Sequence, residues 1–176
     1  MEFSNLTIDP ELLPKAEELT LLPIEPSYRK VLQLQWLITS LVVLAAGATA
    51  IYFIKNLHSA TFIFTVATIW LLLSIAQYVI MQQSFKRKSY ALREKDVLYR
   101  TGWIIRSLHV CPFNRIQHCT VHSGPLERRF GLASISLFTA GSDGSDLTIP
   151  GLTEQKAADL RAFIMQKIKN DEQPAD

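Results

Sequence analysis

The hydrophobic positions of this chain are concentrated in its first half. Two runs of 21 residues, 34–54 and 61–81, contain no charged side chain. Since an α-helix rises about 1.5 Å per residue, about 20 residues cross the hydrocarbon core of a bilayer. The pattern therefore predicts two membrane-spanning helices. The alternative is a pair of buried core helices, which rarely run to about 18 uncharged residues.

A short linker, KNLHSA at 55–60, joins the two runs, so the helices form an antiparallel hairpin with both ends of the chain on one side. Lys and Arg flank the outer ends of the hairpin at 29–30 and 86–88, whereas the linker holds only Lys55. Loops on the cytoplasmic side carry an excess of Lys and Arg. We therefore predict that both termini are cytoplasmic.

A secretory signal peptide is the other interpretation of the first run, because AAGATA at 45–50 mimics a cleavage site. However, about 30 residues with six acids precede this run, and an equally apolar run follows it closely. Both features favour a retained hairpin. Neither run contains an ionisable residue, which argues against a transporter, because ion pathways usually need intramembrane charges.

Downstream of residue 81, hydrophobic and polar positions alternate over short runs, which is the period of a β-strand. Six of the seven glycines lie between residues 102 and 151, where they separate these runs. The predicted strands are 89–92, 96–101, 103–111, 115–123, 134–139 and 146–150, with turns at 93–95, 112–114 and 141–144 and one helical turn at 125–130.

An amphipathic helix follows, with Thr153 as its N-cap and Glu154 in its first turn. Its apolar stripe is Ala157, Leu160, Phe163, Ile164 and Ile168. Strands closed by one helix predict an antiparallel α+β domain, most simply a bent sheet or barrel plugged by that helix. The predicted divisions are an N-terminal segment (1–30), the hairpin (31–81), the β-rich domain (82–170) and a C-terminal tail (171–176).

The N-terminal segment leaves two interpretations open. Its four prolines prevent a long helix, while its leucines argue against simple disorder. It forms either a short helical turn that packs on the membrane or the domain, or a loose tail.

Composition agrees with a membrane protein, because only 19% of residues are charged, against roughly 25% in soluble domains. Residues 1–30 carry three basic and six acidic residues, and residues 82–176 carry fourteen and ten. A surplus of four basic residues favours anionic lipid mildly and is too weak to imply a nucleic-acid partner.

The stretch HCTVH at 118–122 invites a metal or thiol interpretation. In a strand, His118 and His122 share one face but lie about 13 Å apart, and Cys119 points to the other face. Zinc ligands lie about 2.0–2.3 Å from one point, so we predict no metal site. Cys111 and Cys119 lack the surroundings of an activated thiol and are predicted to be structural and reduced. We expect no cofactor and no catalytic residue.

The segments NRIQ (114–117), SGPLERRFGLASISLFTAG (123–141) and IPGL (149–152), with the helix after them, are similar to a known family. Over residues 20–168 the chain resembles the bacterial pleckstrin-homology-like (PH-like) membrane proteins of the YdbS-like family. The resemblance implies a cytoplasmic PH-like barrel of two near-orthogonal antiparallel sheets, capped by a C-terminal helix, in a multi-pass protein of the bacterial inner membrane.

Within this motif, we expect Ile116, Leu132, Ile135, Leu137 and Ile149 to face the barrel interior. Gly131 and Gly141 supply backbone freedom. The candidate partner- or lipid-binding residues are Arg115, Arg128 and Arg129, and the candidate headgroup contacts are Lys86, Arg87 and Lys88. The alternative for Arg128 and Arg129 is a solvated face or a pair with a domain acid such as Glu127.

Many PH domains hold phosphoinositides through a basic loop between their first two strands. Here that loop is REKD (93–96), whose charges cancel, so phosphoinositide recognition is not expected. The leading hypothesis is a non-enzymatic module that binds another PH-like-domain membrane protein or a second copy of itself. The alternatives are direct binding of anionic lipid or a small ligand, and an enzyme with Cys119 or His118 as its reactive group.

Overall fold

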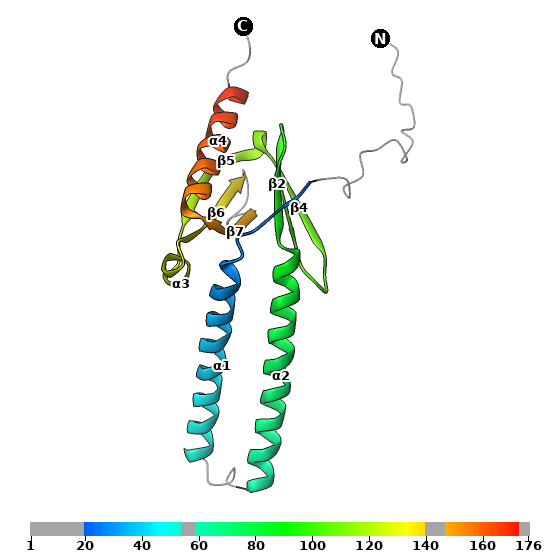
Figure 1. Cartoon of the computed structure of the whole chain (residues 1–176), viewed down its shortest axis with the longest axis vertical. Coiled ribbons are helices and arrows are strands. Elements are labelled where there is room, and N and C mark those ends of the chain that lie inside the picture. Colours follow the sequence, from blue (N-terminus) through cyan, green and yellow to red (C-terminus); the bar gives the residue numbers. More distant parts are fainter. Residues whose placement is uncertain (1–19, 54–58, 140–146, 173–176) are drawn as a thin grey trace, which may run out of the picture.

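The computed structural model describes residues 20–53, 59–139 and 147–172. Two long helices stand side by side and lead into a domain of strands and one further helix (Figure 1). The elements in chain order are β1 (Leu22–Pro23), α1 (Tyr28–Phe53), α2 (Ala60–Arg87), β2 (Ser89–Leu92), β3 (Asp96–Thr101), β4 (Ser107–Pro112), the 3₁₀ helix η4 (Phe113–Arg115), β5 (Ile116–His122), α3 (Pro125–Arg129), β6 (Leu132–Thr139), β7 (Leu147–Thr153) and α4 (Glu154–Glu172).

The two long helices carry their apolar side chains outward. Val31 is the buried residue of α1 and Ser74 that of α2, while Val42 is 62% exposed and Leu73 is 65% exposed. A core helix of a soluble protein buries such side chains. Both helices are also long and apolar enough to cross a membrane, which together with this exposed apolar surface indicates a transmembrane pair.

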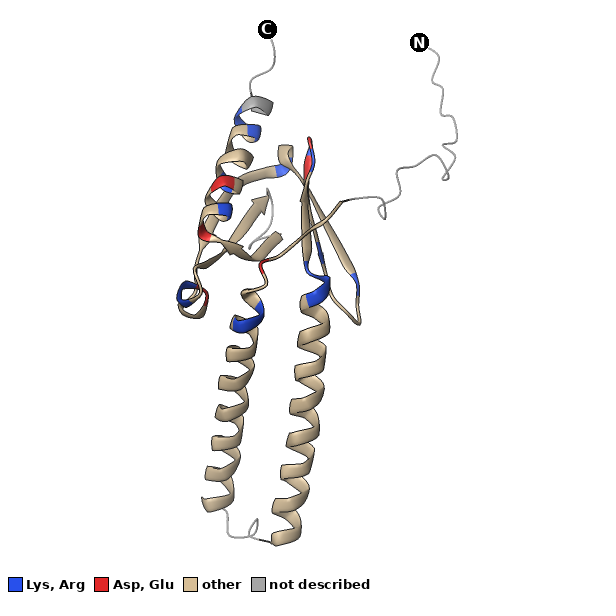
Figure 2. Ribbon diagram, in the orientation of Figure 1, with Lys and Arg blue, Asp and Glu red and all other residues tan. Residues whose placement is uncertain are grey.

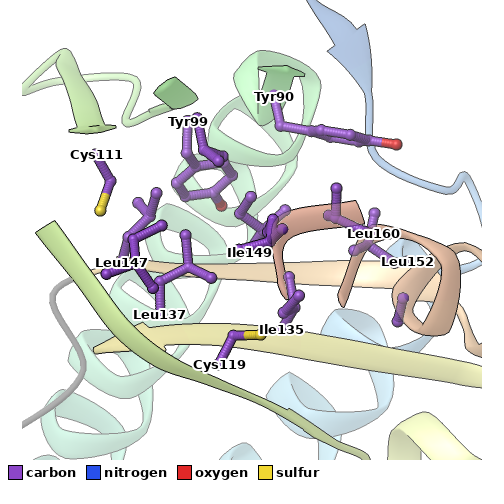
Figure 3. Packing of buried hydrophobic residues seen from close by; sticks show 14 of the residues in the cluster. Tyr90, Tyr99, Cys111, Cys119, Ile135, Leu137, Leu147, Ile149, Leu152 and Leu160 are labelled. Carbon is purple, nitrogen blue, oxygen red and sulfur yellow. The ribbon is translucent and has the colours of Figure 1, made fainter. Parts of the chain in front are cut away.

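The strands form two antiparallel sheets. One sheet has the order β1-β2-β3-β4, and the other has the order β5-β6-β7. Side chains of the first sheet, such as Tyr99 and Cys111, point toward Leu137 and Ile149 of the second (Figure 3). All five residues predicted to face the interior are at most 4% exposed. The predicted PH-like architecture after a helical hairpin is confirmed.

Helix α4 packs its apolar stripe against this core. Ala157, Leu160 and Ile164 are buried in it, and Ile168 packs at its margin. The Thr153 hydroxyl oxygen accepts the Lys156 backbone N–H at 3.2 Å, as expected for an N-cap. Phe163 is 37% exposed and lies at the side of the stripe, where its ring contacts Phe113 edge to face.

The chain differs from the predicted strands at the β3–β4 connection. The strand expected at 103–111 begins only at Ser107. Gly102 has a φ of +89°, and a Cβ there would overlap the carbonyl oxygen of Ile105. The backbone therefore folds back on itself after β3, which a run of β-forming residues does not reveal. The turn expected at 141–144, with Gly141, lies outside the described residues.

The described part of the N-terminal segment, from residue 20, joins the domain, whereas residues 1–19, for which a helical turn and a loose tail are the two interpretations, lie outside the described residues. Leu22 pairs with Tyr90 of β2, and Ile24 is 3% exposed within the core. The Glu25 backbone N–H donates to the Gly151 carbonyl oxygen at 2.9 Å. The β-rich domain therefore includes residues from before the first membrane helix.

Candidate functional site

The domain surface from which α1 and α2 extend is the membrane-proximal face, and Lys and Arg gather on it (Figure 2). This gathering follows from the chain order, because basic residues flank both spans. Lys86 is exposed and Arg87 is half-buried at the end of α2. Both are placed where lipid headgroups would lie, and their predicted headgroup role stays a prediction.

Lys88 is directed into the domain rather than outward. Its Nζ donates to the Tyr99 hydroxyl at 3.2 Å and lies 5.8 Å from the centre of that ring. Burial lowers the pKa of Lys88 and raises the pKa of Tyr99 to about 12. The structure therefore separates Lys88 from the two other basic residues of the predicted headgroup set.

Helix α3 holds Arg128 and Arg129 at the membrane-proximal face, where it contacts α1. The Glu127 carboxylate accepts the Gly124 backbone N–H at 3.0 Å and the Ser134 hydroxyl at 2.7 Å. Glu127 therefore serves as the cap of its own helix rather than as a partner of the arginines. Both arginines are exposed, and among the described residues neither forms an ion pair.

Arg115 does not share a site with these two arginines. It ends η4, whereas α3 follows the far end of the seven-residue strand β5. At about 3.3 Å per residue, the strand separates the two positions by roughly 20 Å. The three arginines therefore do not converge on one ligand.

The HCTVH stretch is a strand, as predicted, and its side chains are used structurally. The His118 ring stacks on Phe138, with centroids 4.4 Å apart and planes 11° apart. Cys119 is buried in the core, and burial raises the pKa of its thiol. Within the described ranges, no group of three His, Cys, Asp or Glu side chains could hold a metal ion.

Gly131 behaves as predicted, since its φ of +63° follows directly on α3. Sequence reasoning missed Gly151, whose φ is +68° and whose Cα faces the Tyr28 ring. It also missed a groove of about 440 Å³ between α1 and α2. The small residues near Gly47 were the only sequence signal for that groove.

The model of a family described as Bacterial PH domain matches residues 29–168, which includes both membrane helices. The chain belongs to the bacterial PH domain family. A relative, the UPF0699 transmembrane protein YdbS of Bacillus subtilis (strain 168), is 31% identical over 147 residues, covering 80% of this chain and 88% of the relative. No solved structure matches the chain.

The bacterial PH domain family is not a known enzyme family, and the relative in it is a transmembrane protein. In this bacterial PH domain the loop at 93–96 lies at the end of the sheet away from the membrane helices (Figure 2). Arg93 Nε donates to Asp96 Oδ1 at 2.6 Å, so the loop also neutralises its own charge. Both features argue against a phosphoinositide site in this loop.

Proposed function

We propose that this chain is a non-enzymatic protein of the bacterial inner membrane whose cytoplasmic PH-like domain is an assembly module. Its partner is a second membrane chain of the same architecture. The groove between α1 and α2 carries this proposal, and the exposed apolar side chains of β4 support it.

Hydrogen bonds join the two membrane helices near the domain. Gln33 donates to the Tyr78 hydroxyl at 3.3 Å, Trp36 donates to the Ser74 carbonyl oxygen at 3.2 Å, and Ser40 and Ser74 share a hydrogen bond of 2.9 Å. All three hydrogen bonds join α1 to α2. In the half of the hairpin farther from the domain, apolar side chains of both helices line the space between them.

The groove lies in that second half. Its lining is apolar and includes the small residues Gly47, Ala48 and Ala67. Membrane helices associate through close packing, which small residues permit by letting backbones approach. A further apolar helix fits such a groove better than flexible lipid tails do, because it fills the space with fixed contacts.

Strand β4 offers a second contact above the membrane. Among the described residues, it is the last strand in the order of its sheet. Leu108 and Val110 on it are 40% and 48% exposed. A second chain of the same architecture would hold its own β4 and its own membrane helices at the same heights as those of the first chain. In both chains the membrane helices lead directly into the sheet.

The candidate reactive groups argue against an enzyme. A nucleophilic cysteine needs a lowered pKa, whereas burial raises that of Cys119. The His118 ring is stacked on Phe138. Both side chains are accounted for by packing.

The test is photo-crosslinking of the full chain in intact cells. A photoreactive amino acid replaces Ala48 in the groove or Val110 on the β4 edge, and the matched controls are Val42, on the opposite side of α1, and Leu92, at the far end of the sheet. We expect adducts from Ala48 and Val110 that contain a PH-like-domain chain. Mass spectrometry distinguishes a second copy from a related chain. Equal adduct yields at the control positions would refute the proposal.

A further inference from the structure

The connection between β3 and β4 carries the most exposed large hydrophobic side chains that the structure describes outside α1 and α2. Ile104 is 71% exposed and Ile105 is 79% exposed, and Trp103 beside them is 37% exposed. We call these three residues, which lie at the turn of the β3–β4 hairpin, the hairpin tip. An apolar tip of this kind is costly in water, at about 25 cal/mol per Å² of exposed apolar surface.

The strand register places the hairpin tip beside the membrane end of α2. Ser89, two residues after the end of α2, pairs with Arg100 in β3. Strand β3 runs back toward the membrane, so the residues after Arg100 extend past the end of the sheet and alongside α2 (Figure 1). Strand β3 contacts α2, in agreement with this course.

The depth of the hairpin tip follows from the geometry of the two elements. Strand β3 ends at Thr101 and the chain turns at Gly102, so the hairpin tip extends at most roughly 10 Å beyond Arg100, at about 3.3 Å per residue. Lys88 is extended and carries the chain about 6–7 Å from Ser89 to Arg87, so about two residues of α2, at about 1.5 Å each, cover the rest and bring the tip level with Phe85. Phe85 lies between the uncharged run 61–81 and Lys86, so the tip lies at the height of the headgroups, close to their boundary with the hydrocarbon.

The chemistry around the hairpin tip suits an anionic lipid surface. Arg100 and Arg106 flank it and are exposed, and Lys86 and Arg87 lie on the neighbouring end of α2. No Asp or Glu occurs from residue 97 to residue 126. Tryptophan is enriched at the membrane–water boundary, and each basic residue near an anionic surface contributes about 1 kcal/mol.

We propose that the hairpin tip inserts into the leaflet in which α1 begins and α2 ends, as a third membrane anchor of the domain. Trp103 lies among the headgroups, Ile104 and Ile105 enter the upper hydrocarbon, and Arg100 and Arg106 bind lipid phosphates. The anchor fixes the domain against rotation about the ends of the helices. This inference requires that α1 and α2 span the membrane. It does not require that the chain assembles with a partner.

The experiment uses the full chain in vesicles of equal parts phosphatidylcholine and phosphatidylglycerol, at a high ratio of lipid to protein. Ile104→Cys carries an environment-sensitive fluorophore, and Leu92→Cys, at the opposite end of the same sheet, carries it in the matched control. The native cysteines are buried, and the unsubstituted chain labelled in parallel corrects for them. The quenchers are a phospholipid with a nitroxide high on its acyl chain and aqueous iodide.

We expect the nitroxide lipid to quench the label at position 104 several-fold more than the label at position 92, and iodide to do the reverse. Ile105→Asp in the same chain is expected to abolish the difference while Cys111 and Cys119 stay protected from alkylation. Equal nitroxide quenching at both positions overturns the proposal. Protection from both quenchers also overturns it, because a protein then covers the tip. Loss of the difference in high salt overturns apolar insertion in favour of electrostatic adsorption.

Discussion

Gly151 of strand β7 lies against Tyr28, where the β-rich domain contacts the first membrane helix. Its replacement by alanine tests how tightly the domain and this helix are packed together. A Cβ at this position would lie 2.6 Å from Cγ of Tyr28 and 2.8 Å from its Cβ. Carbon atoms in contact prefer about 3.5–4.0 Å, so the Tyr28 ring must move. Tyr28 is the first residue of α1, so its displacement is transmitted to the membrane helix.

The cost has two parts that a matched control separates. Alanine in the left-handed region costs roughly 1–2 kcal/mol, and overpacking adds about 1–3 kcal/mol. Gly131 has a similar φ of +63°, but no atom lies within 4 Å of the position its Cβ would take. Gly131→Ala therefore carries only the backbone cost. We expect Gly151→Ala to lower the free energy of unfolding by about 1–3 kcal/mol more than Gly131→Ala does.

The measurement is a urea titration of the full chain in mild detergent. Cys111 and Cys119 are buried in the core, so pulsed alkylation of their thiols reports the unfolded fraction of the domain. Both substitutions restrict the unfolded chain equally, which removes that effect from their difference. Tyr28→Ala deletes the ring but keeps the Cβ, so the penalty of Gly151→Ala should fall part of the way toward that of Gly131→Ala. Equal penalties for the two glycines, or no relief by Tyr28→Ala, would refute the reasoning.

Three further predictions concern the core and the α3 cap. Because burial raises the pKa of Cys119, its alkylation in the folded chain should accelerate at a higher pH than that of free cysteine; a faster rate at neutral pH would contradict a structural thiol. Glu127→Ala removes the acceptor of the Gly124 N–H and the Ser134 hydroxyl, and should lower the free energy of unfolding by about 1 kcal/mol in the same titration. Ile135 is fully buried, so Ile135→Ala should cost about 2–5 kcal/mol, and a change below this range would mean that the core relaxes around the cavity.

Sequence alone determined the features that depend on local pattern. The spans at 34–54 and 61–81 are properties of uninterrupted apolar runs, because lipid must solvate every side chain along such a helix. Alternation at 115–123 and 134–139 predicted β5 and β6, and the stripe from Ala157 to Ile168 predicted the face of α4. The candidate arginines could be predicted to be exposed, and their binding role stays a prediction.

Tertiary structure decided the features that join distant segments. Strand β1 has two residues and no period of its own, and exists because β2 supplies its partners. Lys88 turns inward because Tyr99 lies beside it in space, eleven positions later in the chain. The hairpin tip faces the membrane because the register of β2 and β3 directs it there. Periodicity cannot reveal such contacts, because the free energy that selects them comes from packing between residues far apart in sequence.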